Sequence, residues 1–172
     1  INQNFTNQKL LCIEGRKINN CTKAGLAGWN VTLTNGSYSA NTTTNITGYY
    51  QFCGLMPDRY TVSEILKPGW KNVTTLDQTA ELGCLNNKTN VDFYNDPLLC
   101  ISGTKFNNCT KLGLDGWTVI VKDSKGTEVG RNVTANGGKW QVCGLLPGAY
   151  TVSELLKPNW KNVTALDQNV TL

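Results

Sequence analysis

The same domain-sized pattern occurs twice in this sequence, and the repetition limits the fold more than any other feature. Residues 10–29, LLCIEGRKINNCTKAGLAGW, return at 98–117 as LLCISGTKFNNCTKLGLDGW, an offset of 88 residues. Residues 51–78 return at 141–168 with an offset of 90, so two extra residues lie between the matches in the second copy. This self-similarity predicts two homologous domains, at 10–96 and 97–172.

The register of the repeat leaves one strand without its domain. Residues 2–8, NQNFTNQ, match residues 90–96, NVDFYND. Leu172 aligns with Leu82, so the second domain has no counterpart of residues 90–96 in this sequence. We expect the second domain to receive its last strand from outside the 172 residues.

We predict that residues 1–9 form a strand that completes the domain of a neighbouring unit, with Ile1, Gln3 and Phe5 as its donated side chains. The expected partners are copies of the chain joined head to tail. Those copies are either separate subunits of a homopolymer or tandem repeats of one longer polypeptide. Both arrangements build an extended fibre or stalk.

Short alternating runs of apolar and polar residues, bounded by Gly, Pro, Asn and Asp, recur along the chain and predict an all-β fold. The expected core faces are Trp29, Val31 and Leu33 in the first repeat, and Trp117, Val119 and Val121 in the second. Roughly seven strands in 90 residues fit a β-sandwich. The sequence therefore predicts two tandem β-sandwich domains, the second lacking its last strand.

Seven cysteines recur at matching places, which indicates disulfides and an oxidising compartment. Four cysteines in the first repeat allow three connectivities, and the sequence does not choose among them. We favour Cys12 with Cys84, because a strand's start and the turn before the last strand can share one end of a sandwich. The other expected pairings are Cys21 with Cys53, Cys109 with Cys143, and Cys100 with a partner outside this sequence.

Twelve of the 21 asparagines stand in N-x-[S/T] sequons, several times what this composition gives by chance. The excess predicts covalent N-linked glycans and an extracellular location. The sequons are at Asn4, Asn20, Asn30, Asn35, Asn41, Asn45, Asn72, Asn87, Asn108, Asn132, Asn162 and Asn169.

Several function classes find no support in the sequence. The net charge of +4 comes from scattered Lys and Arg, so nucleic-acid binding is not predicted. The chain has no histidine and no CxxC pair, so we predict no zinc site, no activated thiol and no cofactor. Since no apolar run reaches 18 residues, membrane insertion is not predicted. We expect no enzyme activity beyond one-turnover self-crosslinking.

Strand alternation places charged and amide side chains on the same faces as apolar ones. In the first repeat the shared faces hold Ile13, Gly15 and Lys17; Tyr60, Val62 and Glu64; and Val91, Phe93 and Asn95. In the second repeat they hold Ile101, Gly103 and Lys105, and Tyr150, Val152 and Glu154. Because an unpaired buried charge is unfavourable, each of these polar groups should meet a partner.

The run from CGL through YTVSE to KPxW, followed by VDFYND, resembles the B-type repeat domains of prokaryotic surface adhesins. These include the collagen-adhesin and serine-aspartate-repeat B domains and their archaeal relatives. The resemblance covers both repeats and implies immunoglobulin-like or prealbumin-like sandwiches that act as stalks, spacers or pilus subunits outside the cell. The acidic calcium loop of some members is replaced by the short NNCTK, so calcium binding is not implied.

Collagen-adhesin-type domains form an intramolecular isopeptide bond, in which a lysine amine attacks an asparagine amide and a carboxyl group shuttles protons. Desolvation that lowers a lysine pKa and raises a carboxyl pKa favours the attack. The implied positions are Lys17, Asn95 and Glu64 in the first repeat, and Lys105, Glu154 and Asn7 of another unit for the second. A buried Lys–Glu pair without a bond, or strand-end residues that reach solvent, are the alternatives.

Taken together, these features predict a glycosylated, disulfide-bonded structural segment of an extracellular filament, stalk or cell-surface layer. The alternative is a ligand-binding adhesin module, which a surface patch of exposed Trp and Tyr would favour. Trp29, Trp70, Trp117 and Trp160 recur at matching positions, and this recurrence favours packing in the core or at corners.

Overall fold

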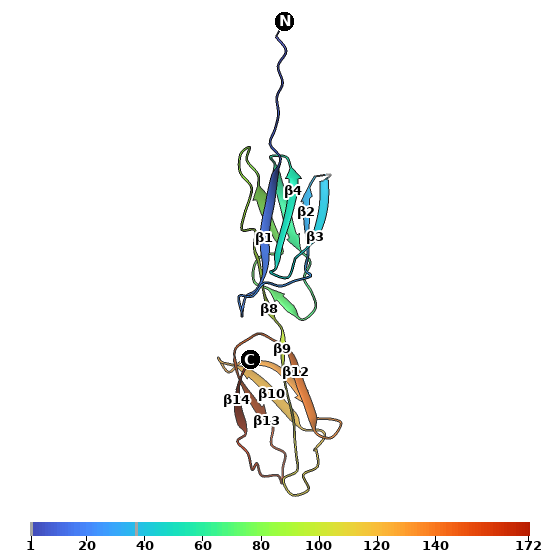
Figure 1. The fold of residues 1–172 in the computed structure, drawn as a ribbon. Helices are drawn as coiled ribbons and strands as arrows, with labels where there is room; N and C mark the ends of the chain where they lie inside the picture. The colour runs from blue at the N-terminus through green and yellow to red at the C-terminus, as the bar shows by residue number, and fades with distance from the viewer. Residues whose placement is uncertain (1, 37) are drawn as a thin grey trace. The chain divides into compact units, whose positions relative to one another are not determined.

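The computed structural model describes residues 2–36 and 38–172. All regular elements in these residues are β-strands, which confirms the all-β prediction (Figure 1). No helix in them is long and apolar enough to cross a membrane. The chain divides into unit 1, residues 1–96, and unit 2, residues 97–172.

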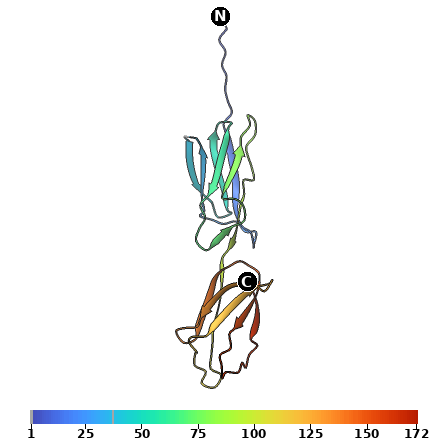
Figure 2. The ribbon, with the colours of Figure 1, turned by 180° about the vertical axis from the view of Figure 1, so that it is seen from behind.

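Unit 1 is a sandwich of two four-stranded sheets, seen from two sides in Figures 1 and 2. The first sheet has the order β4-β1-β8-β6 and contains β1 (Leu11–Asn19), β4 (Tyr49–Leu55), β6 (Trp70–Asn72) and β8 (Phe93–Pro97). The second has the order β3-β2-β5-β7 and contains β2 (Asn30–Asn35), β3 (Tyr38–Thr43), β5 (Arg59–Glu64) and β7 (Asp77–Glu81). Strand β8 runs parallel to β1 and closes this sheet between β1 and β6.

The core of unit 1 lies where the inward faces of its two sheets meet. The residues that alternation assigned to those faces are buried, from Ile13 on β1 to Val31 and Leu33 on β2, Val62 on β5, and Phe93 on β8. Each inward face therefore follows the period of two along its strand, as predicted.

Unit 2 has one complete sheet and one short sheet. The complete sheet has the order β11-β10-β13-β14 and contains β10 (Thr118–Asp123), β11 (Glu128–Val133), β13 (Ala149–Glu154) and β14 (Asp167–Thr171). The short sheet pairs β9 (Leu99–Thr104) with β12 (Lys139–Leu145). Within residues 97–172 no strand takes the place that β8 and β6 have in unit 1. One edge of β9 is therefore unpaired.

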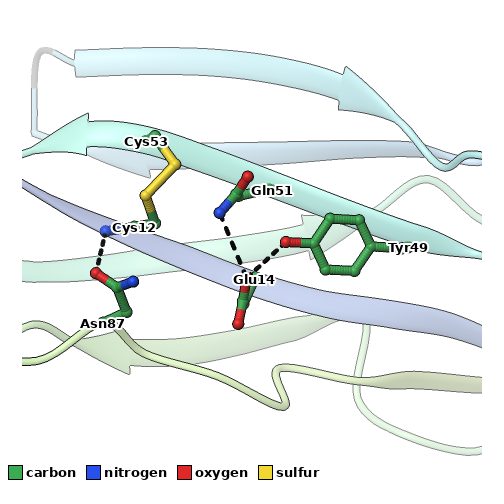
Figure 3. Close-up of a disulfide and its surroundings, with 6 residues drawn as sticks. All are labelled: Cys12, Glu14, Tyr49, Gln51, Cys53 and Asn87. Carbon is green, nitrogen blue, oxygen red and sulfur yellow. Dashed lines mark hydrogen bonds between the residues drawn. A yellow bond between two sulfur atoms is a disulfide. The ribbon is translucent and has the colours of Figure 1, made fainter.

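The predicted cysteine pairing is wrong. Cys12 is bonded to Cys53, and Cys100 to Cys143, while Cys21, Cys84 and Cys109 are free and exposed. Cys12 and Cys53 stand opposite each other on the antiparallel pair β1 and β4, with a Cα–Cα distance of 4.1 Å (Figure 3). Cys100 and Cys143 do the same on β9 and β12, so Cys100 has its partner inside unit 2.

The physical reason for the error is strand register. Two cysteines directly opposite in an antiparallel pair have β-carbons close enough to bond without bending the backbone. Cys84 lies in the exposed stretch between β7 and β8, outside that pair, and Cys21 lies beyond the end of β1. The expected Cys12–Cys84, Cys21–Cys53 and Cys109–Cys143 pairings are each replaced by this ladder geometry.

The predicted donor segment makes no strand within its own chain. Residues 2–10 are exposed, and Phe5 has 92% of its surface in contact with solvent. Ile1, the first predicted donor residue, lies outside the described residues. Because the structure contains one copy of the chain, strand donation to a neighbour stays a prediction.

Candidate cross-linking site and strand groove

Three strands of unit 1 bring Lys17, Glu64 and Asn95 together in the core. The Nζ atom of Lys17 lies 2.5 Å from Oε2 of Glu64, and Nδ2 of Asn95 donates a hydrogen bond of 3.4 Å to the same oxygen. All three residues are buried. Alternation predicted that these groups face inward, and the amine, carboxylate and amide that the resemblance implies lie together in the structure.

The surroundings of Lys17 favour a reactive amine. Its Nζ atom lies 4.5 Å from the ring centroid of Trp29, which covers it with an apolar face. Burial lowers the pKa of Lys17, and the hydrogen bond and charge of Glu64 oppose that shift. Since a deprotonated amine is the nucleophile, the enclosure makes Lys17 easier to use as one.

Two oxygens at this site have no hydrogen-bond partner in the described residues: Oδ1 of Asn95 and Oε1 of Glu64. A buried carbonyl oxygen without a donor is unusual, because satisfying it normally stabilises the fold. Both oxygens belong to the carboxyl and amide groups that the expected cross-linking reaction would use.

The backbone around β8 fixes the position of Asn95. Asn19 pairs with Asn95 in the parallel register of β1 and β8. The hydroxyl of Tyr50 donates a hydrogen bond to the carbonyl oxygen of Val91, and burial raises the pKa of that hydroxyl, so it stays a donor. A β-carbon at Gly15 would overlap the same carbonyl, so glycine at position 15 permits β8 to lie this close.

This arrangement can form an amide between two side chains. In such a reaction the neutral amine of Lys17 would attack Cγ of Asn95, the new Nζ–Cγ bond would replace the Cγ–Nδ2 bond, and ammonia would leave with protons passed through Glu64. The sum is one amide exchanged for another, with no oxidant or cofactor involved. Both bond partners are on rigid strands, which holds the reacting groups close together.

Unit 2 contains two of the three groups. The Nζ atom of Lys105 lies 2.5 Å from Oε2 of Glu154 and 4.5 Å from the ring centroid of Trp117, matching unit 1. This pair is less enclosed than its counterpart, because part of each side chain is exposed. The asparagine that matches by sequence, Asn7, is in the exposed segment 2–10. Unit 2 therefore presents a half-site that opens to solvent.

Lys105 and Glu154 line an open groove of about 830 Å³ in unit 2. The groove lies beside the unpaired edge of β9 and has Val119, Trp140 and Val152 among its walls. Its volume is in the range of pockets that enclose a ligand. In unit 1 the matching space is occupied by β8.

The residues that hold β8 in unit 1 have counterparts around this groove. In unit 1, Val73 N donates to the carbonyl of Tyr94 at 2.8 Å, Gln78 Nε2 donates to the carbonyl of Asp92 at 2.7 Å, and Asn20 N donates to the carbonyl of Asn95 at 2.8 Å. Their counterparts by sequence are Val163, Gln168 and Asn108, and all three line the groove. The groove therefore has the donors that a strand like β8 needs.

One departure from unit 1 lies in the groove wall. Trp140 stands where unit 1 has Tyr50, so the hydroxyl that binds the Val91 carbonyl has no counterpart. The matching residue of the segment 2–8 is Gln3 where unit 1 has Val91. The segment 2–8 thus differs from residues 90–96 at the position that faces this change in the wall.

All twelve sequon asparagines are described and lie outside the core, exposed or half-buried.

The four recurring tryptophans form two packed pairs. Trp29 and Trp117 are buried, and Trp70 and Trp160 pack against them edge to face, with ring centroids 5.6 and 5.2 Å apart, so packing explains their recurrence. Sequence reasoning missed Trp29 and Trp117 as covers for the lysines. The signal was available in their shared strand face with Val31 and Val119.

Unit 1 is similar to a known family of domains. Residues 14–96 match the model of the SdrD B-like domain. A curated relative is the serine-aspartate repeat-containing protein F of Staphylococcus epidermidis, 27% identical over 150 residues. The match covers 74% of this chain and 9% of that protein, so the chain spans a small fraction of its relative's length.

Three solved structures are similar over most of the chain. The Bacillus anthracis TIE protein is 20% identical with a TM-score of 0.49, covering 94% of this chain and 31% of that one. A streptococcal ancillary pilin is 19% identical with a TM-score of 0.47, covering 97% and 60%. BcpA, the major pilin subunit of Bacillus cereus, is 9% identical with a TM-score of 0.43, covering 95% of both. At these scores nothing about function passes from them to this chain.

Proposed function

We propose that the chain, whose residues 14–96 match the SdrD B-like domain, is a structural segment of an extracellular filament or stalk. We propose that its units are joined head to tail, each incomplete unit 2 taking the segment 2–8 of the following copy as its last strand. The following copy is a separate subunit or the next repeat of a longer chain. Such joining is heterologous and extends without limit unless it closes a ring.

The observation that carries this proposal is the groove of unit 2. It has the volume, the unpaired strand edge and the hydrogen-bond donors that match the seat of β8 in unit 1. The segment 2–8 repeats the sequence of residues 90–96, with Phe5 and Asn7 in the places of Phe93 and Asn95. Phe93 is fully buried in unit 1, whereas Phe5 is exposed and free to enter another copy.

Electron microscopy of the purified chain tests the strand joint. The wild-type chain should form linear head-to-tail assemblies, and Phe5→Asp should stay monomeric, because a charge in the core of the groove is strongly unfavourable. Ile46→Asp is the matched control, since Ile46 is 88% exposed and lies outside the segment. If Phe5→Asp forms assemblies to the same extent as the wild-type chain, the proposed strand joint is wrong.

We further propose that Lys17 and Asn95 become covalently joined in unit 1, with Glu64 as the proton carrier. A bond across β1 and β8 would lock the strand that completes the sandwich, which suits a protein that bears tension. The support is geometric: one oxygen of Glu64 contacts both reacting groups inside a dry core.

Intact-mass measurement after deglycosylation and reduction tests this bond. The wild-type chain should be lighter than its sequence mass by one ammonia, about 17 Da, for each bond formed. Glu64→Gln and Asn95→Ala should restore the full mass. Lys67→Met is the control, because Lys67 also lies near Trp29, at 5.3 Å, but is exposed and has no role in the reaction. Full mass in the wild-type chain would contradict the bond.

Glycans on the sequon asparagines complete the proposal, and their exposure supports it. The adhesin alternative has less support from the aromatic residues. Trp29 and Trp117 are buried and Trp70 is half-buried, so among the four recurring tryptophans Trp160 alone stays exposed, at 41%. A structural role is therefore the function we propose.

A further inference from the structure

Unit 1 has two free cysteines that its own fold keeps apart. Cys21 lies two residues after the end of β1, whereas the carbonyl of Cys84 accepts a 3.3 Å hydrogen bond from Nε2 of Gln8, which lies just before β1 begins. The nine residues of β1 span about 30 Å at about 3.3 Å each. A disulfide requires Cα atoms within about 7 Å, so Cys21 and Cys84 of one unit cannot pair.

The loop that carries Cys21 contacts the end of β8. Asn20 donates from its backbone to the Asn95 carbonyl at 2.8 Å and from its side chain to Oδ1 of Asp96 at 3.0 Å. Cys21, the next residue, is therefore beside the last residues of the completing strand. Whatever strand takes this place ends within reach of that cysteine.

Unit 2 has the same loop at residues 107–109, but within residues 97–172 no strand like β8 lies beside it. The backbone of Cys109 donates to Oδ1 of Asn107 at 2.8 Å, as the backbone of Cys21 does to Asn19 at 2.9 Å. Asn108 and Cys109 line the open groove, and Cys109 is a free, exposed thiol. The loop is thus already shaped for the end of an incoming strand.

The strand joint proposed above brings a second cysteine to this loop. When the segment 2–8 of a following copy lies in the groove in the register of β8, its Asn7 and Gln8 take the places of Asn95 and Asp96, beside Asn108 and Cys109. Gln8 also holds the carbonyl of Cys84 in its own copy. Cys109 of one copy and Cys84 of the next then lie on either side of the same residue.

We propose that each joint is closed by a disulfide between Cys109 of one copy and Cys84 of the following copy. This inference rests on the strand joint of the proposed function. The two thiols lose two protons and two electrons and form one S–S bond, while a low-molecular-weight disulfide oxidant is reduced to two thiols. The partner is a second copy of this chain, and the bond makes the joint resistant to dissociation in oxidising surroundings.

Isotope-mixed cross-link mapping tests the proposal. Equal amounts of ¹⁵N-labelled and unlabelled chain are assembled in a glutathione redox buffer, blocked with an alkylating reagent, deglycosylated and digested without reduction. We expect a linked pair of peptides that carry Cys84 and Cys109 and come from differently labelled chains. The pair should be lost in Cys84→Ser and Cys109→Ser and retained in Cys21→Ser, which is the matched free-thiol control.

The possible results separate this inference from the strand joint. If the chain assembles but Cys84 and Cys109 are alkylated freely, the disulfide is absent and the joint stands. If linked peptides contain Cys21 as often as Cys84 or Cys109, the thiols pair by random collision and the proposal is overturned. If neither assembly nor linkage occurs in any redox buffer, the strand joint fails and the disulfide fails with it.

Discussion

The amine of Lys17 is enclosed in an apolar core, and burial and the nearby Glu64 act on its protonation in opposite directions. Removal from water disfavours the charged form, whereas the carboxylate of Glu64 at 2.5 Å favours it. Breaking a buried ion pair by deleting one partner typically destabilises a protein by about 3–5 kcal/mol. A covalent bond to Asn95 would remove this dependence, because an amide nitrogen carries no charge.

The pH dependence of stability follows from the lowered pKa of Lys17 in a chain that cannot cross-link. In Asn95→Ala the unfolded chain binds the lysine proton up to the ordinary pKa of 10.5, whereas the folded chain releases it at lower pH. The unfolded state therefore binds more protons between the folded pKa and 10.5. By linkage, stability rises with pH across that window.

We expect the free energy of unfolding of Asn95→Ala, measured by urea denaturation, to increase from neutral pH towards 10.5. The double variant Lys17→Met/Asn95→Ala lacks the buried amine and should not show that increase. The difference between the two curves isolates Lys17 from all other titrating groups. Parallel curves would mean that burial does not depress this pKa.

Among the strands, alternation was sufficient to predict which residues face inward. It placed Lys17, Glu64 and Asn95 on core faces of three different strands, and the structure brings them together there. Alternation is a local property with a period of two, so it can be read from each strand alone.

The disulfide pairing could not be predicted in the same way. Cys12 pairs with Cys53 because they stand opposite in the ladder of β1 and β4, 41 residues apart in sequence. That register is set by how two distant strands align, which no single run of residues contains. The same applies to the groove of unit 2, whose walls come from β9, β13 and the segment after Trp160.

Gly103, on the strand edge that the incoming segment would pair with, gives a prediction at the scale of the strand. A β-carbon at Gly15 would overlap the Val91 carbonyl of unit 1, and Gly103 is its counterpart in the groove of unit 2. In Gly103→Ala the new methyl would lie 2.8 Å from the Trp140 ring, so that ring must shift within the open groove. The methyl and the shifted ring should both obstruct the incoming strand.

We expect Gly103→Ala to weaken head-to-tail association at least about tenfold, or ~1.4 kcal/mol, as measured by sedimentation of assembling chains. Gly148→Ala is the control, because a β-carbon there meets only the Tyr150 ring at 3.9 Å. Association of Gly103→Ala at the wild-type strength would show that no backbone comes close to Gly103 in the assembly. That result would place the incoming segment elsewhere.

At the scale of the whole molecule, the two units differ by one completed strand. In unit 1, Val91 just before β8 and Phe93 on β8 are buried in a continuous core. In unit 2 the corresponding space is open, and the main core cluster contains Ile101, Val121, Val142, Leu145 and Tyr150. The sequence repeat implies that unit 2 would reach the stability of unit 1 once a strand is supplied.

Supplying that strand within the same chain is the sharpest test of this reasoning. Leu172 aligns with Leu82, so a copy of residues 83–96 added after Leu172, with Ser in place of the copied cysteine, should reach the groove by the path that unit 1 uses. Burial of the copied Val and Phe side chains contributes about 1.5–3 kcal/mol each. We therefore expect unit 2 to gain about 3 kcal/mol or more in urea denaturation, and the chain to become monomeric.

The matched control is the same extension with Asp in place of the copied Phe, which should neither stabilise unit 2 nor stop assembly. Both extended chains have the same length and nearly the same composition, so only insertion into the groove separates them. If the Phe-containing extension leaves stability and assembly unchanged, the groove does not accept a strand of this sequence. If the proposed joint exists, occupation from within the chain competes with donation from another copy for one site, and filling that site should stop growth.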